Sequence, residues 1–288
     1  MRPVAALLLL AGCATSEYER MSRLEREVRH ALAREVPEAA ASVWLARTDG
    51  REVLVLDADR KLPAASTIKI LLLVEGYAQE AEGAFRWEDS VTFLEEDRVG
   101  GAGSMQHEKP GSTWTYRQLA RRMISESDNV ASNLILKRLG MKSVNRRAER
   151  LGLEVTRFSR LFMDLDAQRE GRENWTTARE LGQLARAIFR KEILTPEACE
   201  EMIAVLEHTG RRRIAEGVPK GIAVGHKGGT LPGLCHDVGW VAVPGQPYIL
   251  SIFLDNVYES RRPGEDRGIA AIEAVARAVW RAMGPGDE

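Results

Sequence analysis

The sequence lacks the long apolar run that a transmembrane helix needs. Hydrophobic residues make up 44% of its 288 residues, but no internal stretch approaches the roughly 18 consecutive apolar residues of a membrane span. Basic residues number 41 and acidic residues 42, so there is no excess positive charge of the kind that nucleic-acid-binding domains carry. The apolar fraction and the formal charge of −1 also exclude an intrinsically disordered chain. We therefore expect a folded body that does not bind nucleic acid.

Cysteine and histidine are scarce. Three cysteines are too few for a disulfide scaffold or a four-thiolate zinc site. The five histidines include no helical pair with a glutamate between them, so we expect neither a metal nor any other cofactor. Two interpretations of Cys199 and Cys235 stay open: a disulfide in an oxidising compartment, or two buried, small hydrophobic residues.

The N-terminus has the features of a secretory signal. A basic start, the apolar run Val4–Leu10 and two small residues precede Cys13. The end of this segment resembles the bacterial lipoprotein box, in which the cysteine is lipidated and becomes the new N-terminus. We therefore expect a signal peptide over residues 1–12 and a body from residue 13 whose acyl chains hold it at the periplasmic face of a membrane. Ala14 resembles outer-membrane sorting, provided that the source is Gram-negative.

Periodicity and turn signals predict an α+β fold. A helix at residues 17–36 and strands at 42–47 and 53–57 open the body, and strands at 222–226, 238–243 and 248–255 with a helix at 269–283 close it. Thr115, Thr177 and Thr195 are predicted helix caps, and with terminal glycines they divide the middle into several helices. We expect an antiparallel five-stranded sheet flanked by helices (about residues 17–62 and 210–288) and an all-helical lobe (about 63–209). A ligand cleft is expected where the two lobes meet.

A serine and a lysine lie three residues apart at the start of the helical middle. This spacing brings Ser66 and Lys69 onto one face of a helix. The free N–H groups at a helix N-terminus favour developing negative charge. A lysine that is buried beside another cation can lose its proton and act as a base. Such pairs also occur by chance, so the spacing alone does not establish a catalytic pair.

Two further short segments have both an ordinary and a functional interpretation. Ser127-Asp128-Asn129 separates two apolar helices, and alone it is a helix cap. Lys227-Gly228-Gly229-Thr230 lies on the first strand of the C-terminal half. It is either a glycine-rich bend with a solvated lysine or a strand against which a substrate can lie, because glycine has no side chain.

Together, the three segments match a known set in order and spacing. They resemble the Ser-x-x-Lys, Ser-Asp-Asn and Lys-Thr-Gly motifs of class A β-lactamases and penicillin-binding proteins. The similarity continues in Pro110-Gly111, in 124–134, in Leu139-Gly140 and in Leu151-Gly152, and extends over roughly residues 20–285. The chain therefore resembles the penicillin-recognising serine hydrolases, and this implies a β-lactamase-like fold.

The resemblance implies a role for each matching residue. Ser66 would attack a carbonyl and form an acyl-enzyme, with Lys69 as proton acceptor. Ser127 would pass a proton to the leaving nitrogen, and Asn129 would hydrogen-bond the side-chain amide of the substrate.

The third motif would bind the substrate. Lys227 would attract its carboxylate and lower the pKa of Lys69. The backbone N–H groups of Ser66 and Thr230 would form the oxyanion hole, and Gly229 would let the substrate lie against the strand. The run 211–213 of three arginines is either a solvated surface or the source of one arginine that holds the carboxylate.

Two positions depart from the family pattern. Gly228 stands where a hydroxyl normally follows the lysine. The family's deacylating glutamate lies two residues after the second arginine of a Thr-Arg-x-x-Arg run, and Phe162 occupies that position here. Asp164 is our candidate for the replacement base and Asp166 is the alternative. Both aspartates can instead belong to the structure and solvation of the loop.

We therefore expect a membrane-tethered, class A-like β-lactamase, a monomer that opens β-lactam amides as part of an antibiotic response. The missing glutamate keeps a second interpretation open, a D-alanyl peptidase, amidase or esterase of the cell envelope with slow deacylation and a peptidoglycan-like substrate. A third interpretation is a catalytically silent, envelope-binding lipoprotein.

Overall fold

The computed structural model describes residues 4–258 and 266–285, with side chains from residue 19 onward. Within these ranges the helices are α1 (Val4–Glu35), α2 (Lys69–Ala81), α3 (Tyr116–Ser125), α4 (Asn129–Leu139), α5 (Met141–Arg150), α6 (Leu165–Arg169), α7 (Ala178–Phe189), α8 (Pro196–Glu207) and α9 (Arg267–Met283). Short 3₁₀ helices are η1 (Ala65–Ile68), η2 (Glu95–Asp97), η3 (Met105–His107) and η4 (Arg213–Gly217). The strands are β1 (Ala40–Arg47), β2 (Glu52–Leu56), β3 (Leu62–Pro63), β4 (Ser90–Thr92), β5 (Thr113–Thr115), β6 (Trp175–Thr176), β7 (Val224–Leu231), β8 (Leu234–Val241) and β9 (Tyr248–Asp255).

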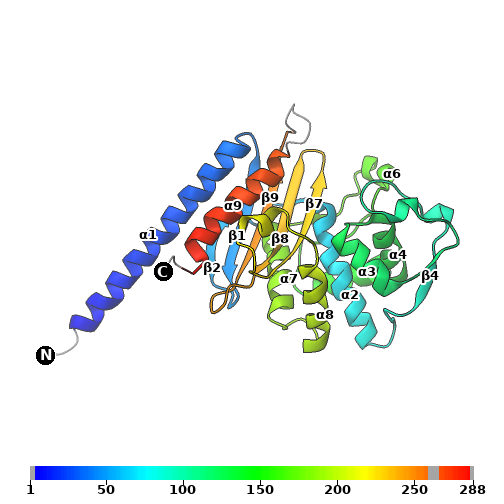
Figure 1. Cartoon of the computed structure of the whole chain (residues 1–288), viewed down its shortest axis with the longest axis horizontal. Helices are drawn as coiled ribbons and strands as arrows, with labels where there is room; N and C mark the ends of the chain where they lie inside the picture. Colours follow the sequence, from blue (N-terminus) through cyan, green and yellow to red (C-terminus); the bar gives the residue numbers. More distant parts are fainter. Residues whose placement is uncertain (1–3, 259–265, 286–288) are drawn as a thin grey trace.

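Both ends of the chain contribute to one five-stranded antiparallel sheet, in the order β2-β1-β9-β8-β7. This confirms the predicted α+β architecture (Figure 1). The sequence pattern ended the first C-terminal strand at residue 226, whereas β7 continues to Leu231. The ladder with β8 runs on through Gly228 and Gly229, which pair with Asp237 and His236.

The sheet is buried on both faces, and the alternation of side chains along its strands divides the core in two. On β1, Val43 and Leu45 join the core beneath α1 and α9, while Trp44 and Ala46 join the core shared with the helical lobe. The same period of two holds on β9. Figure 1 shows α1 and α9 side by side on one face of the sheet, with α7 and α2 on the other.

The helical lobe begins at α2, where the run from Lys69 to Gln79 is buried throughout. Three predicted caps are confirmed: the side chains of Thr115, Thr177 and Thr195 accept backbone N–H bonds at the starts of α3, α7 and α8. Each satisfies a donor that a helix N-terminus leaves unpaired. The three motifs lie at the boundary of the lobes: one where η1 leads into α2, one at the turn between α3 and α4, and one on β7 of the sheet.

The cysteines that follow the N-terminal segment are not bridged. Cys199 on α8 and Cys235 on β8 are both free and buried. They belong to different cores, one in the helical lobe and one beneath α1 and α9. Of the two interpretations of this pair, the structure supports the two small hydrophobic residues.

The first helix starts earlier than its periodicity predicted, at Val4 rather than at Glu17. Its side chains up to residue 18, including that of Cys13, lie outside the described residues. Among the described residues, no helix combines the length and apolar character needed to cross a membrane.

Candidate active site

The hydroxyl of Ser66 is placed at the junction of the two lobes by the 3₁₀ turn η1, which leads directly into α2. Ala65 precedes it with a φ of +48°, a left-handed conformation that is uncommon for a residue with a side chain. Ser66 lines two adjoining cavities of about 550 and 230 Å³. The strained turn therefore presents this hydroxyl to the cleft that the sequence predicted.

Lys69 lies in a fully buried position and is held by the second motif. Its Nζ donates to the Ser127 carbonyl at 2.6 Å, to Asn129 Oδ1 at 3.0 Å and to Ser127 Oγ at 3.3 Å. Its Nζ also lies 4.5 Å from the centre of the Phe162 ring. Ser127 has a φ of +58°, so a second strained residue turns its carbonyl and hydroxyl toward the lysine.

Lys227, from the other lobe, reaches the same hydroxyl. Its Nζ donates to Ser127 Oγ at 3.1 Å and to the Gly228 carbonyl at 2.9 Å. Ser127 Oγ therefore accepts from both lysines. A hydroxyl has two acceptor lone pairs and one donor, so the Ser127 proton is left to point away from the lysines.

Burial and mutual repulsion change the charge state of both lysines. Burial, and next the charge of Lys227, hold the pKa of Lys69 well below its ordinary value, while Asp128 raises it in part. Burial, and next the neighbouring Arg213, lower the pKa of Lys227 to about 7, against the opposing effect of Asp237. Near neutral pH the site therefore holds a deprotonated amine beside a protonated one more readily than two ammonium groups.

Ser66 Oγ has no hydrogen-bond partner among the described residues, so the predicted contact with Lys69 is not made as a hydrogen bond in this structure. Lys69 instead donates to Ser127 and Asn129. Catalytic hydrogen bonds in unliganded sites are often long and shorten only when the substrate binds. The structure thus brings the predicted residues into one cleft and leaves the Ser66 hydroxyl open to an incoming carbonyl.

Gly228 and Gly229 on β7 lie at positions where other parts of the chain pack too closely for a side chain. A Cβ at Gly229 would come within 2.8 Å of the Ser66 backbone nitrogen and 3.1 Å of that of Thr67. A side chain there would cover the Ser66 N–H, which is one of the two donors that the resemblance assigns to the oxyanion hole. Thr230 lines the same two cavities as Ser66.

Gly228, the first departure from the family pattern, makes room for an arginine. A Cβ at this position would overlap the Arg213 guanidinium. Arg213 Nη2 donates to Thr230 Oγ1 at 2.7 Å, and Arg212 and Arg213 line the smaller cavity with Lys227. Two arginines of the run 211–213 therefore reach the cleft, and Arg213 is the one bonded to Thr230. The hydroxyl missing at position 228 is replaced by a guanidinium, which suits recognition of a carboxylate.

Sequence reasoning missed the residues that hold Arg213 in place. His226 and Asp237 are buried on β7 and β8, and His226 Nδ1 lies 2.9 Å from Asp237 Oδ1. Asp237 Oδ2 accepts the Ile214 backbone N–H at 3.0 Å, and His226 Nε2 lies 3.2 Å from the Gly210 carbonyl. The pair thus ties both ends of the arginine segment to the sheet. No signal in the sequence pointed to this pair, because only the register of β7 against β8 brings His226 and Asp237 together.

The second departure, Phe162, is fixed by its backbone. Asn133 Oδ1 accepts the Phe162 N–H at 2.8 Å, and Asn133 Nδ2 donates to the Phe162 carbonyl at 3.0 Å. The ring is buried and lies against Lys69. A hydrophobic ring therefore occupies the wall of the cleft where the family pattern has a carboxylate.

The two aspartates considered as replacements have other partners. Asp164 caps α6 by accepting the Ala167 N–H at 2.9 Å, and Asp166 is exposed and paired with Arg169. Neither lines either of the two cavities. The carboxylate that does line the larger one is Glu173, which the sequence had not singled out as a site residue.

The Glu173 carboxylate already has several hydrogen-bond and ion-pair partners. It forms an ion pair with Arg160 at 2.8 Å, and its oxygens accept from the Asn174 N–H at 2.7 Å and from Gln168 at 3.1 Å. Asn174 also accepts from the backbone of Ser159. These bonds join the two ends of the loop, so the carboxylate serves loop structure and has few lone pairs left for a water.

Comparison with known proteins agrees with this geometry. A family model described as "Beta-lactamase enzyme family" matches residues 23–283. A β-lactamase of Bacillus licheniformis is 27% identical over 269 residues, which cover 88% of this chain and 87% of that protein. The crystal structure of a β-lactamase from Sphaerobacter thermophilus has a TM-score of 0.82 at 28% identity and covers 91% of this chain and 96% of that one.

A penicillin-binding protein is similar to the same extent. A point mutant of PBP-A, solved as the acyl-enzyme complex with penicillin G, has a TM-score of 0.80 at 29% identity, covering 91% of this chain and 96% of that one. The chain is thus similar over nearly its whole length both to enzymes named for β-lactam hydrolysis and to a protein trapped as a penicillin adduct.

The charge on Lys227 predicts a pH dependence of this site. With a pKa of about 7, Lys227 is protonated below that pH and neutral above it, so its attraction for a carboxylate falls as pH rises through 7. Replacing Arg213 by glutamine removes a neighbouring positive charge, so the pKa of Lys227 should rise. Carbon NMR titration of the lysine Cε signals, with the Lys227 signal assigned from Lys227→Met, measures the pKa of Lys227 in the wild type and in Arg213→Gln.

The matched control is Arg211→Gln, because Arg211 belongs to the same arginine run but pairs with Glu216 and the Val218 carbonyl. In this variant the pKa of Lys227 should keep its wild-type value. A Lys227 midpoint near the ordinary 10.5 would contradict the prediction, as would equal shifts in the two variants.

Proposed function

The chain belongs to the beta-lactamase enzyme family, and we propose that it hydrolyses the amide bond of β-lactams through an acyl-enzyme on Ser66. One observation carries the proposal: two buried lysines from different lobes share the hydroxyl of Ser127 beside the open hydroxyl of Ser66. A site with two mutually repelling amines favours one neutral amine, which is the base that a serine nucleophile needs.

The acylation step follows from this arrangement. Ser66 Oγ attacks the lactam carbonyl carbon and its proton passes to the neutral amine of Lys69. The negative charge that develops on the carbonyl oxygen is stabilised by the backbone N–H groups of Ser66 and Thr230, and Gly229 leaves that of Ser66 uncovered. The tetrahedral intermediate then collapses and the carbon–nitrogen bond breaks.

The leaving nitrogen needs a proton, and Ser127 is placed to give one. Its oxygen accepts from Lys69 and Lys227, so its own hydrogen is free to donate toward the nitrogen. Lys69 can return a proton to Ser127 along the existing hydrogen bond. Asn129 Oδ1 holds Lys69, and we assign to its amide the further role of contacting the substrate side chain.

The carboxylate of the substrate would bind in the smaller cavity, which Lys227, Arg212 and Arg213 line. Arg213 is positioned through Thr230. An arginine supplies a planar pair of donors that matches a carboxylate, and its charge persists at pH values where Lys227 has lost its own.

Phe162 favours a second candidate, a penicillin-binding peptidase, amidase or esterase that acylates readily and deacylates slowly. Asp164 and Asp166 face other partners, and Glu173 is engaged by Arg160. Without a positioned general base the acyl-enzyme would lose the roughly 10²–10⁴-fold acceleration that such a group supplies.

Acylation at Ser66 is tested by mass spectrometry and a chromogenic cephalosporin. The wild type should gain the mass of benzylpenicillin on Ser66 and hydrolyse the cephalosporin, and Ser66→Ala should do neither. Ser90→Ala, on the exposed strand β4, is the control and should behave as the wild type. A wild type that neither forms an adduct nor hydrolyses the cephalosporin would contradict both enzymatic candidates and leave the silent binding protein.

The role of position 162 is tested by introducing the missing carboxylate. In Phe162→Glu the side chain starts from a backbone that Asn133 holds, so we expect the adduct lifetime to fall by about 10²–10⁴-fold. Phe162→Gln removes the ring without supplying a base and should leave the adduct long-lived. Equal lifetimes in the two variants would show that deacylation does not depend on a base at this position. Circular dichroism checks that both variants are folded.

For location we propose that Cys13 is lipidated after removal of residues 1–12 and that the acyl chains hold the enzyme at the periplasmic face of a membrane, as a monomer. A basic start, a short apolar run and the small residues before Cys13 support this. A periplasmic enzyme of this kind would meet β-lactams before they reach the cell-wall peptidases, and so contribute to antibiotic resistance.

Lipidation is tested with Cys13→Ser. The wild type should incorporate labelled palmitate and sediment with membranes, whereas Cys13→Ser should incorporate none. Cys199→Ser is the control, because that buried thiol takes no part in anchoring. Label retained in Cys13→Ser would contradict the proposal.

A further inference from the structure

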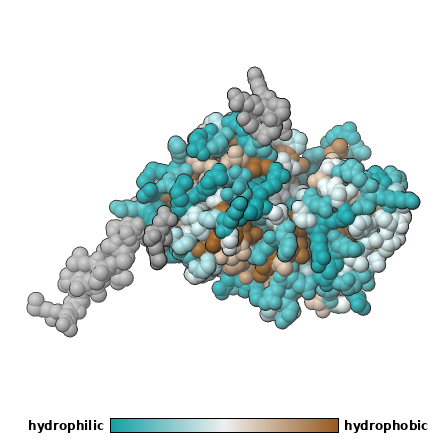
Figure 2. Space-filling view, viewed as in Figure 1, coloured by the Kyte–Doolittle hydropathy of each residue, from teal (hydrophilic) through white to brown (hydrophobic). Residues whose placement is uncertain are grey.

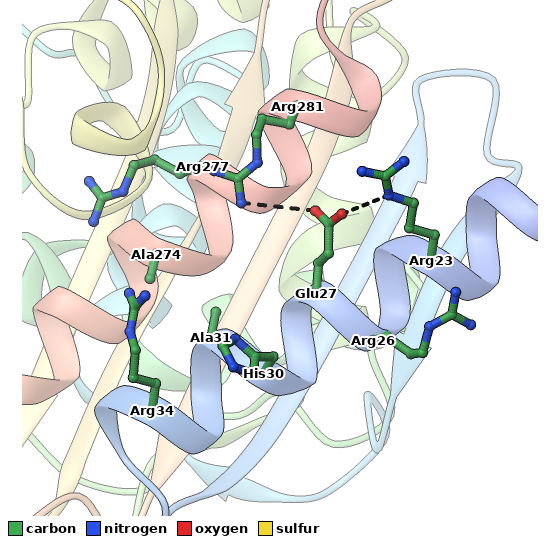
Figure 3. Close-up of a pocket in the computed structure, with 9 residues that line it drawn as sticks. All are labelled: Arg23, Arg26, Glu27, His30, Ala31, Arg34, Ala274, Arg277 and Arg281. Carbon is green, nitrogen blue, oxygen red and sulfur yellow. Dashed lines mark hydrogen bonds and ion pairs between the residues drawn. The ribbon is translucent and has the colours of Figure 1, made fainter.

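A groove between α1 and α9 lies on the face of the molecule away from the helical lobe. Five arginines and one carboxylate line it, with His30 and two alanines: Arg23, Arg26, Glu27, Arg34, Arg277 and Arg281 are its charged members. It has a volume of about 480 Å³. Figure 3 shows that the arginines come from both helices and that the Glu27 carboxylate lies between Arg23 and Arg281.

The single glutamate that lines this arginine groove cannot neutralise its five arginines. Glu27 forms ion pairs with both Arg23, at 2.9 Å, and Arg281, at 3.9 Å. Arg26 is exposed and has no acidic partner among the described residues. Arg277 is 3.7 Å from Glu273 and Arg34 is 2.7 Å from Glu35, and neither of these glutamates lines the groove. The groove therefore has a surplus of guanidinium groups, which are suited to bind phosphate.

The position of the groove indicates which phosphate it meets. Helix α1 carries the groove arginines and continues past the body toward the N-terminus (Figure 1). Cys13 lies ten residues before Arg23 on this helix, about 15 Å along its axis. A lipid attached at Cys13 would hold the groove beside the membrane surface and raise its effective concentration there.

The rest of this face is compatible with contact to headgroups. Figure 2 shows that hydrophilic residues cover most of the surface over α1 and α9, with hydrophobic residues confined to smaller areas. A charged surface of this kind does not insert into a bilayer but can lie on one. No residue that lines the arginine groove lines either cavity of the catalytic cleft, so the cleft would stay open.

We propose that the arginine groove binds the phosphates of anionic phospholipids and sets the orientation of the enzyme on the membrane. The proposal rests on the proposed anchoring at Cys13, which supplies the membrane, but the binding chemistry belongs to the groove alone. Acyl chains and a basic patch can act together as two signals for membrane attachment.

The test uses the full chain carrying Cys13→Ser, so that no lipid is attached, and vesicles with and without phosphatidylglycerol in phosphatidylcholine. The chain should sediment with the phosphatidylglycerol vesicles and be released by salt. Arg26→Gln with Arg277→Gln should weaken this binding by about 25-fold, because each arginine near an anionic surface contributes about fivefold.

The control is Arg86→Gln with Arg121→Gln, two exposed arginines of the helical lobe that change the net charge equally. It should leave vesicle binding unchanged, and both double variants should retain acylation at Ser66. Equal binding to the two kinds of vesicle, or equal loss in the two double variants, would overturn the proposal. So would full competition by soluble glycerol phosphate, which would identify a site for free phosphate. A chain that is acylated but does not prefer phosphatidylglycerol overturns this inference and leaves the proposed function intact.

Discussion

Two buried amines donating to one hydroxyl form the constraint on which the rest of the structure depends. Lys69 and Lys227 come from different lobes and meet at Ser127 Oγ. Bringing both out of water is unfavourable for the charged forms, so the protein must supply acceptors and let at least one amine lose its proton. The Ser127 and Gly228 carbonyls and Asn129 Oδ1 supply these acceptors.

This constraint explains why strained backbone and glycine gather at the boundary of the lobes. The positive φ of Ala65 and that of Ser127 turn the two serines of the helical lobe toward the cleft. Gly228 and Gly229 let β7 pass close to Arg213 and to the turn that carries Ser66. Each of these features by itself raises the free energy of the folded state, and the packing of both lobes holds it in place. The large buried sheet and the buried helix α2 provide that rigidity.

Most of the fold and most of the residues of the cleft could be predicted from the sequence, because both depend on local patterns. Alternating strands, threonine caps and terminal glycines are short-range signals, and three short motifs named the residues that meet. The structure added what depends on long-range register: the His226–Asp237 pair, the reach of Arg213 and the ion pair of Glu173 with Arg160. No spacing within one segment could predict these contacts, since each joins different segments. Side-chain direction was equally out of reach, so Asp164 as a base and the direct Ser66–Lys69 contact remained hypotheses.

The loop that carries Phe162 shows how one substitution is accommodated by its surroundings. The ring packs edge-on against Phe158 at 6.0 Å between centroids and lies over the amine of Lys69. A carboxylate there would raise the pKa of Lys69 by its charge, whereas a neutral ring adds no charge and contributes to the burial that lowers this pKa. The same replacement removes the base that would activate water. In the proposed mechanism, the side chain at position 162 would therefore affect acylation and deacylation in opposite directions.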